Sequence, residues 1–254
     1  MKIPVTASFL KRLFGRSLEP SARYVWVMIM IIQTGCGTYY HYPTYQNIPV
    51  NRKAGEIRGD YFLSEASEGF SLSYSITKNL GAFVNVNTFK QYDFQEGAHM
   101  SDLGLYFFKA KNLTESPAIT MTPSLSAAYG FGQYNRNRDY YRLDIHRAYL
   151  QPSVAITSNI IDIGLSGRLS RVDYQLDRFY NDESSEHHYA NLYDVGKKPF
   201  YFFEPGFFIG VGYKWVKLQF HTFRSVQLDD SEILYYEDTG YLSLSIQLDL
   251  EKWF

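Results

Sequence analysis

The C-terminal stretch 241–254, YLSLSIQLDLEKWF, alternates between apolar and polar side chains. Its leucines and isoleucine share one parity with Phe254, whereas its serines, Gln247 and Asp249 share the other. This period of two predicts a β-strand with one apolar face. A long alternating strand with a terminal aromatic residue is typical of bacterial outer-membrane β-barrels, in which pairing of the last strand with the first removes the sheet edge. We therefore predict that the strand ending in Trp253 and Phe254 closes a barrel.

The composition agrees with strands that cross a membrane. Aromatic residues make up 18% of the 254 residues, which is more than a small soluble core needs and is typical of interfacial girdles. A mean hydropathy of -0.28 excludes a bundle of apolar helices but not a barrel, because alternation hides the apolar face from an average. The net charge of -1 provides no basic surface for nucleic acid. The single cysteine, Cys36, excludes an intrachain disulfide.

The N-terminus carries the parts of a secretory signal. Basic residues precede the apolar run 24–32, YVWVMIMII, which is too short to span a bilayer as a helix. The sequence QTGC that follows resembles the cleavage site of bacterial lipoproteins, although Gln33 stands where an aliphatic residue is usual. We expect residues 1–35 to be a signal peptide and Cys36 to become the lipid-modified N-terminus. The alternative is that Cys36 is an ordinary buried thiol.

Residues 36–54 contain two prolines and no sustained period, which predicts a lipid-anchored linker ahead of the barrel. Within it, YQNIP at residues 45–49, followed by GE at 55–56, is similar to the start of mature uncharacterised outer-membrane β-barrel lipoproteins of the Bacteroidota. The resemblance extends over the first hairpin, residues 71–87. It implies an outer-membrane lipoprotein and brings no assigned activity with it.

Segments of period two recur through residues 55–254 and predict ten strands. They lie near 55–63, 69–77, 80–91, 99–110, 117–131, 141–157, 160–176, 199–213, 215–226 and 240–253. Short turns alternate with longer polar loops, as periplasmic turns and extracellular loops do, and an even number suits a bacterial barrel. The expected fold is therefore all-β, an antiparallel up-and-down β-barrel of about ten strands of the outer-membrane type.

Two features conflict with regular strand pairing. Pro123, Pro152 and Pro205 fall inside strands although proline lacks the donor that pairing needs, so each is expected to mark a bulge or a strand end. In the sixth strand the apolar parity changes between Ile145 and Leu150, which predicts one bulge residue there.

Alternation by itself also fits a soluble barrel whose apolar face points inward. Strands of about ten residues or more, with a polar face rich in Ser, Thr and Gly, favour the membrane barrel with a packed lumen. The charged residues expected to face that lumen are Asp162, Arg168, Arg171, Glu204, Lys217 and Asp249. Phe200, Phe202 and Phe208 are expected to obstruct it, and because a barrel of ten strands is narrow, we predict a closed or narrow lumen.

One loop, residues 177–199, brings carboxylates and histidines together. Its candidate metal ligands are Asp182, Glu183, Glu186, His187 and His188, a set that could hold a divalent cation. A solvated loop tip has the same composition and is the commoner case. Because the sequence also has no dinucleotide-binding glycine pattern, phosphate-binding loop or zinc-ligand spacing, we expect neither a metal nor another cofactor.

The strand histidines, His146 and His221, are the candidate catalytic residues. Known barrel enzymes are proteases or lipid hydrolases, which need a histidine placed beside a carboxylate or a serine. No spacing singles out such a triad, so catalysis is not expected. A barrel hydrolase remains one alternative, and a soluble periplasmic lipid-binding β-barrel lipoprotein remains another.

The sequence thus predicts a lipid-anchored outer-membrane barrel with a non-catalytic structural, adhesive or transport-accessory role. We expect its N-terminal lipid on the periplasmic side. The expected partners are outer-membrane lipids, the lipoprotein-processing and barrel-assembly machinery, and an unidentified ligand of the Tyr-rich surface loops, but not nucleic acid.

Overall fold

A computed structural model describes residues 44–64, 67–90, 96–113, 119–136, 141–179, 195–213, 215–228 and 240–250. They belong to one unit of the chain, Gly35–Phe254. The long strands are β1 (Ile57–Ser64), β2 (Ser67–Ser75), β3 (Leu80–Lys90), β4 (Glu96–Phe108), β6 (Ile119–Arg136), β7 (Tyr141–Ser158), β8 (Ile161–Phe179), β9 (Phe200–Tyr213), β10 (Val216–Arg224) and β12 (Gly240–Asp249). The two-residue strands β5 (Lys111–Asn112) and β11 (Val226–Gln227) pair with β6 and β9. Among these residues no helix is both long and apolar enough to cross a bilayer.

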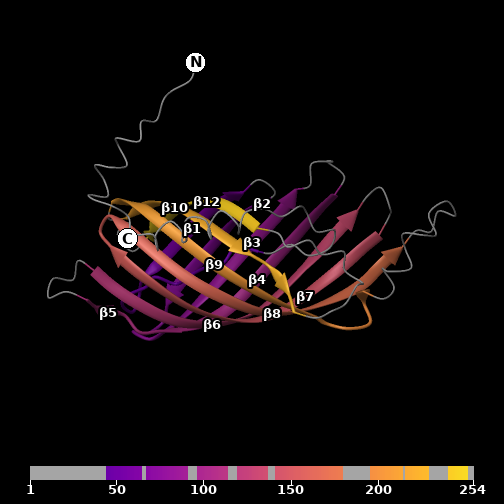
Figure 1. Cartoon of the computed structure of the whole chain (residues 1–254), viewed down its shortest axis with the longest axis horizontal. Helices are drawn as coiled ribbons and strands as arrows, with labels where there is room; N and C mark the ends of the chain where they lie inside the picture. Colours follow the sequence, from indigo (N-terminus) through magenta and orange to yellow (C-terminus); the bar gives the residue numbers. More distant parts are fainter. Residues whose placement is uncertain are drawn as a thin grey trace, which may run out of the picture. The chain divides into compact units, whose positions relative to one another are not determined.

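The ten long strands close into an antiparallel barrel (Figure 1). Each long strand pairs with the next one along the chain, and β12 returns to pair with β1 over Arg58–Ser64. The prediction of ten strands and of closure by the C-terminal strand is therefore confirmed. Trp253 and Phe254 lie outside the described residues.

The two rims of the barrel carry different connections. The turns β2–β3, β7–β8 and β9–β10 lie at one end, here called the short-turn rim. The strand ends that lead into the longer connections β8–β9 and β10–β12 lie at the other end, here called the long-loop rim. This asymmetry is the one expected of periplasmic turns and extracellular loops.

The outer face of the barrel is an apolar belt. Large apolar side chains from every part of the ring are exposed there, among them Leu63, Phe70, Leu103, Leu125, Leu165, Val211 and Leu244. The alternate residues of the same strands are buried in the interior. Since a soluble lipid-carrying barrel would turn its aliphatic faces inward, that alternative is wrong.

An arginine in the middle of this belt tests which solvent the belt meets. Leu165 is 55% exposed on the outer face of β8. We expect Leu165→Arg to lower the free energy of unfolding in lipid vesicles by about 2–4 kcal/mol, the cost of a mid-bilayer cation on the lipid face. Urea titration of the folded fraction measures this, with Leu165→Phe as the control. Equal stability of the two variants would contradict a lipid-facing belt.

The inner face changes character along the barrel axis. Near the long-loop rim it is apolar, and this upper apolar cluster comprises Phe89, Ala98, Met100, Tyr134, Leu143, Ile145, Val172, Tyr174, Val195, Phe200 and Phe202. Nearer the short-turn rim the inner face is mainly polar. Leu143 and Ile145 are therefore inward on the same parity as Arg147, and the bulge predicted between Ile145 and Leu150 is wrong. The parity does not shift there, but the inward residues pass from apolar to polar.

The three prolines do not break the register of the sheet. Pro123 lies opposite Val154, and Pro205 lies opposite Gly167. At Pro152 the pairing of β7 with β8 lapses but resumes at Ser153 in the same register. The predicted bulges or strand ends are therefore wrong. Each proline lies inside its strand and costs one ladder bond without adding a residue. The register shift that β7 does show lies at Arg142 and Leu143.

Candidate functional site

The polar half of the lumen is occupied by the chain's own residues 44–51. All eight are buried, from Thr44 beside Arg147 on β7 to Asn51 beside Ser73 near the short-turn rim. The segment thus runs inside the barrel, antiparallel to the β1 strand that follows it. It is called the lumen segment below. It lies within the predicted linker, residues 36–54.

Gly55 makes the reversal between the lumen segment and β1. Its φ of 83° lies in the left-handed region that only glycine adopts without strain. Its N–H donates to the carbonyl of Ser75 (2.8 Å), and Glu56 accepts from the Ser75 N–H (3.0 Å). The turn is therefore fixed to the end of β2 and sets where the segment enters the lumen.

Substituting Gly55 tests this turn alone. No atom lies close enough to contact an added Cβ, so the cost of Gly55→Ala comes from the backbone. We expect the free energy of unfolding to fall by about 1–2 kcal/mol, the strain of a left-handed non-glycine residue. A urea titration measures the change, and Gly55→Asn, which tolerates this conformation better, is expected to cost less. Equal stability of Gly55→Ala and wild type would contradict the turn.

Two buried arginines hold the first residue of the lumen segment. Arg147 Nη2 donates to Asp102 Oδ1 (2.6 Å) and to the hydroxyl of Thr44. Arg168 Nη1 donates to the same hydroxyl (2.9 Å) and lies 3.6 Å from Glu204 Oε2. With two cations and two carboxylates, the four charges balance, which is the condition for keeping ions in the interior of a protein.

The ring of Tyr149 packs against both guanidinium groups. Their Cζ atoms lie 5.1 Å (Arg147) and 4.6 Å (Arg168) from the ring centroid, within the range of cation–π attraction. This contact and the shared hydroxyl of Thr44 fix the two like charges near each other. The cluster of Asp102, Arg147, Tyr149, Arg168 and Glu204, called the charged cluster below, therefore forms a rigid layer across the lumen.

The middle of the lumen segment is held mainly by side-chain amides. Gln46 Nε2 donates to the carbonyl of Glu204 (2.9 Å), and Asn47 Nδ2 donates to the Ser71 hydroxyl (2.6 Å). Gln151 Nε2 donates to the carbonyl of Asn47 (2.7 Å). At Gly206 a Cβ atom would stand 2.3 Å from Gln46 Oε1, so glycine leaves the room that the segment occupies.

Apolar contacts complete the packing toward the short-turn rim. Ile48 and Val50 form a buried cluster with Ala155 and Phe208. The buried position predicted for Phe208 is thus confirmed, and Phe208 obstructs the lumen together with the segment.

Tyr45 is the single aromatic residue of the lumen segment, and its side chain is buried. Its ring stacks on Phe62 at 4.3 Å with an interplanar angle of 5°. Its hydroxyl lies 3.0 Å from Nε2 of His221. Burial raises the pKa of Tyr45 well above its usual 10.0, so the hydroxyl stays protonated. The hydroxyl shares a hydrogen bond with the His221 ring, and the tautomer of the ring sets its direction.

His221 does have a serine within reach, yet the arrangement is closed. The Ser245 hydroxyl lies 3.2 Å from Nε2 of His221, and Gln219 Oε1 lies 3.0 Å from the same nitrogen. Tyr45, Gln219 and Ser245 thus share one ring nitrogen of a histidine that is 4% exposed. The His221 ring is thus enclosed by the chain's own side chains, whereas a catalytic base has to lie within reach of its substrate.

His146 lies on the outer face instead. Its Nδ1 is 2.9 Å from the Tyr129 hydroxyl, and it has no serine or carboxylate partner in the part of the chain that the structure describes. The structure does not bring His146 and His221 together, since one faces out and the other is in the lumen.

Most of the charges predicted for the lumen are there. Asp162, Arg168 and Glu204 are fully buried, and Lys217 donates to Asp162 Oδ1 (2.6 Å). The prediction that Arg171 faces the lumen is wrong. Its side chain is 54% exposed on the outer face, because Arg171 has the opposite parity to Arg168 along β8. Asp249 is half-buried near the short-turn rim.

Some of the predicted site residues lie outside the described residues. They are Cys36 and the candidate metal ligands Asp182, Glu183, Glu186, His187 and His188. Within the described ranges, no group of three His, Cys, Asp or Glu residues could hold a metal ion.

No pattern in the sequence predicted the lumen segment. An extended segment that is surrounded on all sides has no pair of unlike faces, so it shows no period. A usable signal lay in the wall, where Arg147 interrupts β7 and glycines line the inner face of β9. The glycines leave room in the lumen, and Arg147 supplies hydrogen-bond donors for a segment that occupies it.

Comparison with known proteins finds similar solved structures but no matching family. No protein-family model matches the sequence, and no curated protein matches it. The N-terminal β-barrel domain of Pseudomonas aeruginosa OprF is similar over 77% of this chain and 99% of its own, at 9% identity and a TM-score of 0.32. The outer-membrane protease OmpT from Escherichia coli is similar over 78% of this chain and 94% of its own, at 8% identity and a TM-score of 0.34.

Proposed function

We propose that this protein is an outer-membrane barrel that is sealed from within and acts without catalysis, in a structural, adhesive or transport-accessory role. The apolar belt supports the membrane location, because such a surface is stable only against lipid or another apolar partner. The closed surroundings of His221 and the outward position of His146 support the absence of catalysis. Any partner then meets the protein at its rims or its outer face.

The observation that carries the proposal is that both halves of the lumen are filled. Residues 44–51 and the charged cluster fill the polar half, and the upper apolar cluster fills the half near the long-loop rim. Both fillings consist of the chain's own side chains. A barrel packed in this way anchors loops in a membrane but offers no path for solutes.

Conductance in a planar bilayer tests the sealed lumen. The purified protein is first shown to be folded by its different electrophoretic mobility before and after boiling. We expect no conductance steps from the folded protein, with an open porin as the positive control. Stable steps from the folded barrel would overturn the proposal.

The lipid anchor at Cys36 is part of the same proposal. Cys36 precedes Thr44 by eight positions, at most about 26–29 Å of extended chain, so an acyl chain on Cys36 is able to reach a membrane surface from the lumen segment. Labelled palmitate is expected to enter the wild type and not Cys36→Ala, while both stay in the outer-membrane fraction because the barrel also anchors the chain.

The predicted periplasmic side of the lipid is tested by digesting intact cells with protease and probing for the N-terminus.

A further inference from the structure

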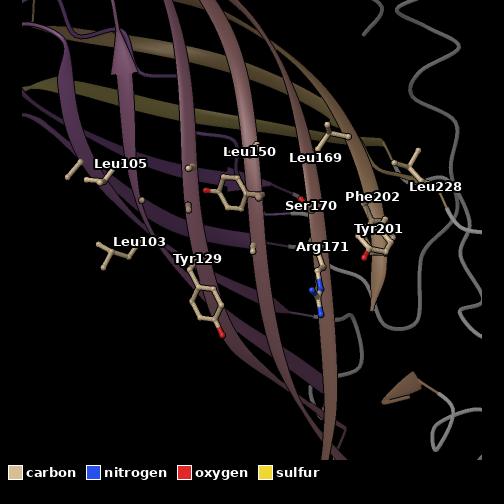
Figure 2. Close-up of a pocket in the computed structure, with 16 residues that line it drawn as sticks. Leu103, Leu105, Tyr129, Leu150, Leu169, Ser170, Arg171, Tyr201, Phe202 and Leu228 are labelled. Carbon is tan, nitrogen blue, oxygen red and sulfur yellow. The ribbon is translucent and has the colours of Figure 1, made fainter. Parts of the chain in front are cut away.

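An open apolar groove of about 890 Å³ crosses the outer face of β4 and β6 to β9 (Figure 2). Two exposed alanines create it. Ala127 lies opposite Leu150, and Ala148 lies opposite Tyr129, so the alanines are diagonal neighbours on adjacent strands. Most other exposed side chains of the belt are large aliphatic or aromatic groups, so these small side chains, with Ala82 at the β3 side, lower the surface between their larger neighbours. The groove is therefore a depression in the lipid-facing belt itself.

The edge of the groove nearest the long-loop rim is polar. Arg171 lies opposite Ala148 on one side and opposite Tyr201 on the other. Arg171 Nη2 donates to Asp173 Oδ1 (3.1 Å), and the Tyr129 hydroxyl contacts His146 (2.9 Å). A guanidinium has five donors in a fork, and the bond to Asp173 uses one of its nitrogens. The edge thus joins a half-exposed cation to hydroxyl and imidazole groups.

The polar edge stands at the height of lipid headgroups. Arg171 is ten positions along β8 from Ile161 (171 − 161) at the short-turn rim, which is about 33 Å of strand. At a tilt of about 40° this becomes about 25 Å along the barrel axis, the height of the apolar band of such barrels. The groove below Arg171 faces hydrocarbon, and Arg171 meets the headgroups of the leaflet at the long-loop rim.

We propose that this groove is a binding site for one lipid molecule with a phosphate in its headgroup. One acyl chain lies over Ala127 and Ala148, and the phosphate binds the guanidinium of Arg171, which suits phosphate oxygens in charge and in geometry. The hydroxyl of Tyr129 lies beside the same headgroup. This inference rests on the proposed membrane location and adds a ligand to it.

Native mass spectrometry of the protein refolded into vesicles tests the site. The vesicles contain either phosphatidylglycerol or diglucosyl diacylglycerol with the same acyl chains, so the two lipids differ only in the headgroup, and phosphatidylglycerol alone carries a phosphate. The variants are Ala148→Phe, which fills the groove, and Arg171→Gln, which removes the charge. Ile156→Phe adds bulk to the outer face of the same strand outside the groove and is the matched control.

The wild type and Ile156→Phe are expected to retain one phosphatidylglycerol, about tenfold more than the uncharged lipid. Ala148→Phe should lose both lipids, and Arg171→Gln should retain the two lipids equally. Lipid retention that is the same in Ala148→Phe and Ile156→Phe would overturn the site, and so would a phosphate preference that survives in Arg171→Gln. A mass of two chains in place of bound lipid would also overturn it, in favour of a dimer. The mobility shift on boiling is recorded for every sample, so a barrel that fails to insert contradicts the proposed function instead.

Discussion

Arg147→Met is expected to lower the free energy of unfolding by about 3–5 kcal/mol, because the substitution leaves Asp102 buried without its counter-charge. Arg147 is 1% exposed and its nitrogen lies 2.6 Å from Asp102 Oδ1. Urea titration of the folded barrel in vesicles measures the loss.

The double variant Arg147→Met/Asp102→Asn separates the ion pair from the rest of the packing. Removing both charges together is expected to cost less than the sum of the single substitutions, since neither charge is then left unpaired. Arg142→Met is the control, because its ion pair with Asp177 (3.3 Å) is about one-third exposed and contributes about 0–1 kcal/mol. If Arg147→Met and Arg142→Met cost the same, the charged cluster does not hold the lumen together.

Tyr45→Ala is the second large effect, and it tests the lumen segment itself. Tyr45 is 3% exposed and stacks on Phe62, so its truncation should cost about 3–5 kcal/mol, as for other buried aromatic residues. Tyr45→Phe keeps the ring and loses the bond to His221, which should cost about 1 kcal/mol.

The pair of Tyr45 variants is informative because they differ in the ring alone. The same urea titration measures both. If Tyr45→Ala were no less stable than Tyr45→Phe, the segment would not be packed in the lumen under those conditions.

The strands of the barrel could be predicted because their two faces differ. Residues such as Leu165 and Ser166 alternate between the outer face and the lumen, and the sequence shows this contrast directly as a period of two. The predictions from this period were wrong where the two faces of a strand have similar composition. Leu143 and Ile145 face inward into an apolar cluster, so an inner face that changes composition looked like a bulge. Arg171 was placed in the lumen by its charge although its parity placed it outside.

The candidate site was harder to predict than the fold, for a physical reason. Arg168 and Glu204 were expected to face the lumen, and they do. What they hold there, Thr44 and its neighbours, comes from a distant part of the chain and has no period of its own. The contacts between this irregular segment and the inner face of the barrel form only when the barrel is closed, so no local sequence pattern predicts them.

The placement of residues 44–51 also constrains the order of assembly. The segment is joined to β1 through the Gly55 turn, and β1 forms the seam of the barrel with β12, the last strand to be made. Once the seven residue pairs from Arg58–Asp249 to Ser64–Ser243 have formed, the wall is continuous and the lumen can be entered only along its axis. Axial entry would require the segment to pass between side chains that are already packed in the lumen, so we expect the sheet to close around the segment before β1 and β12 pair.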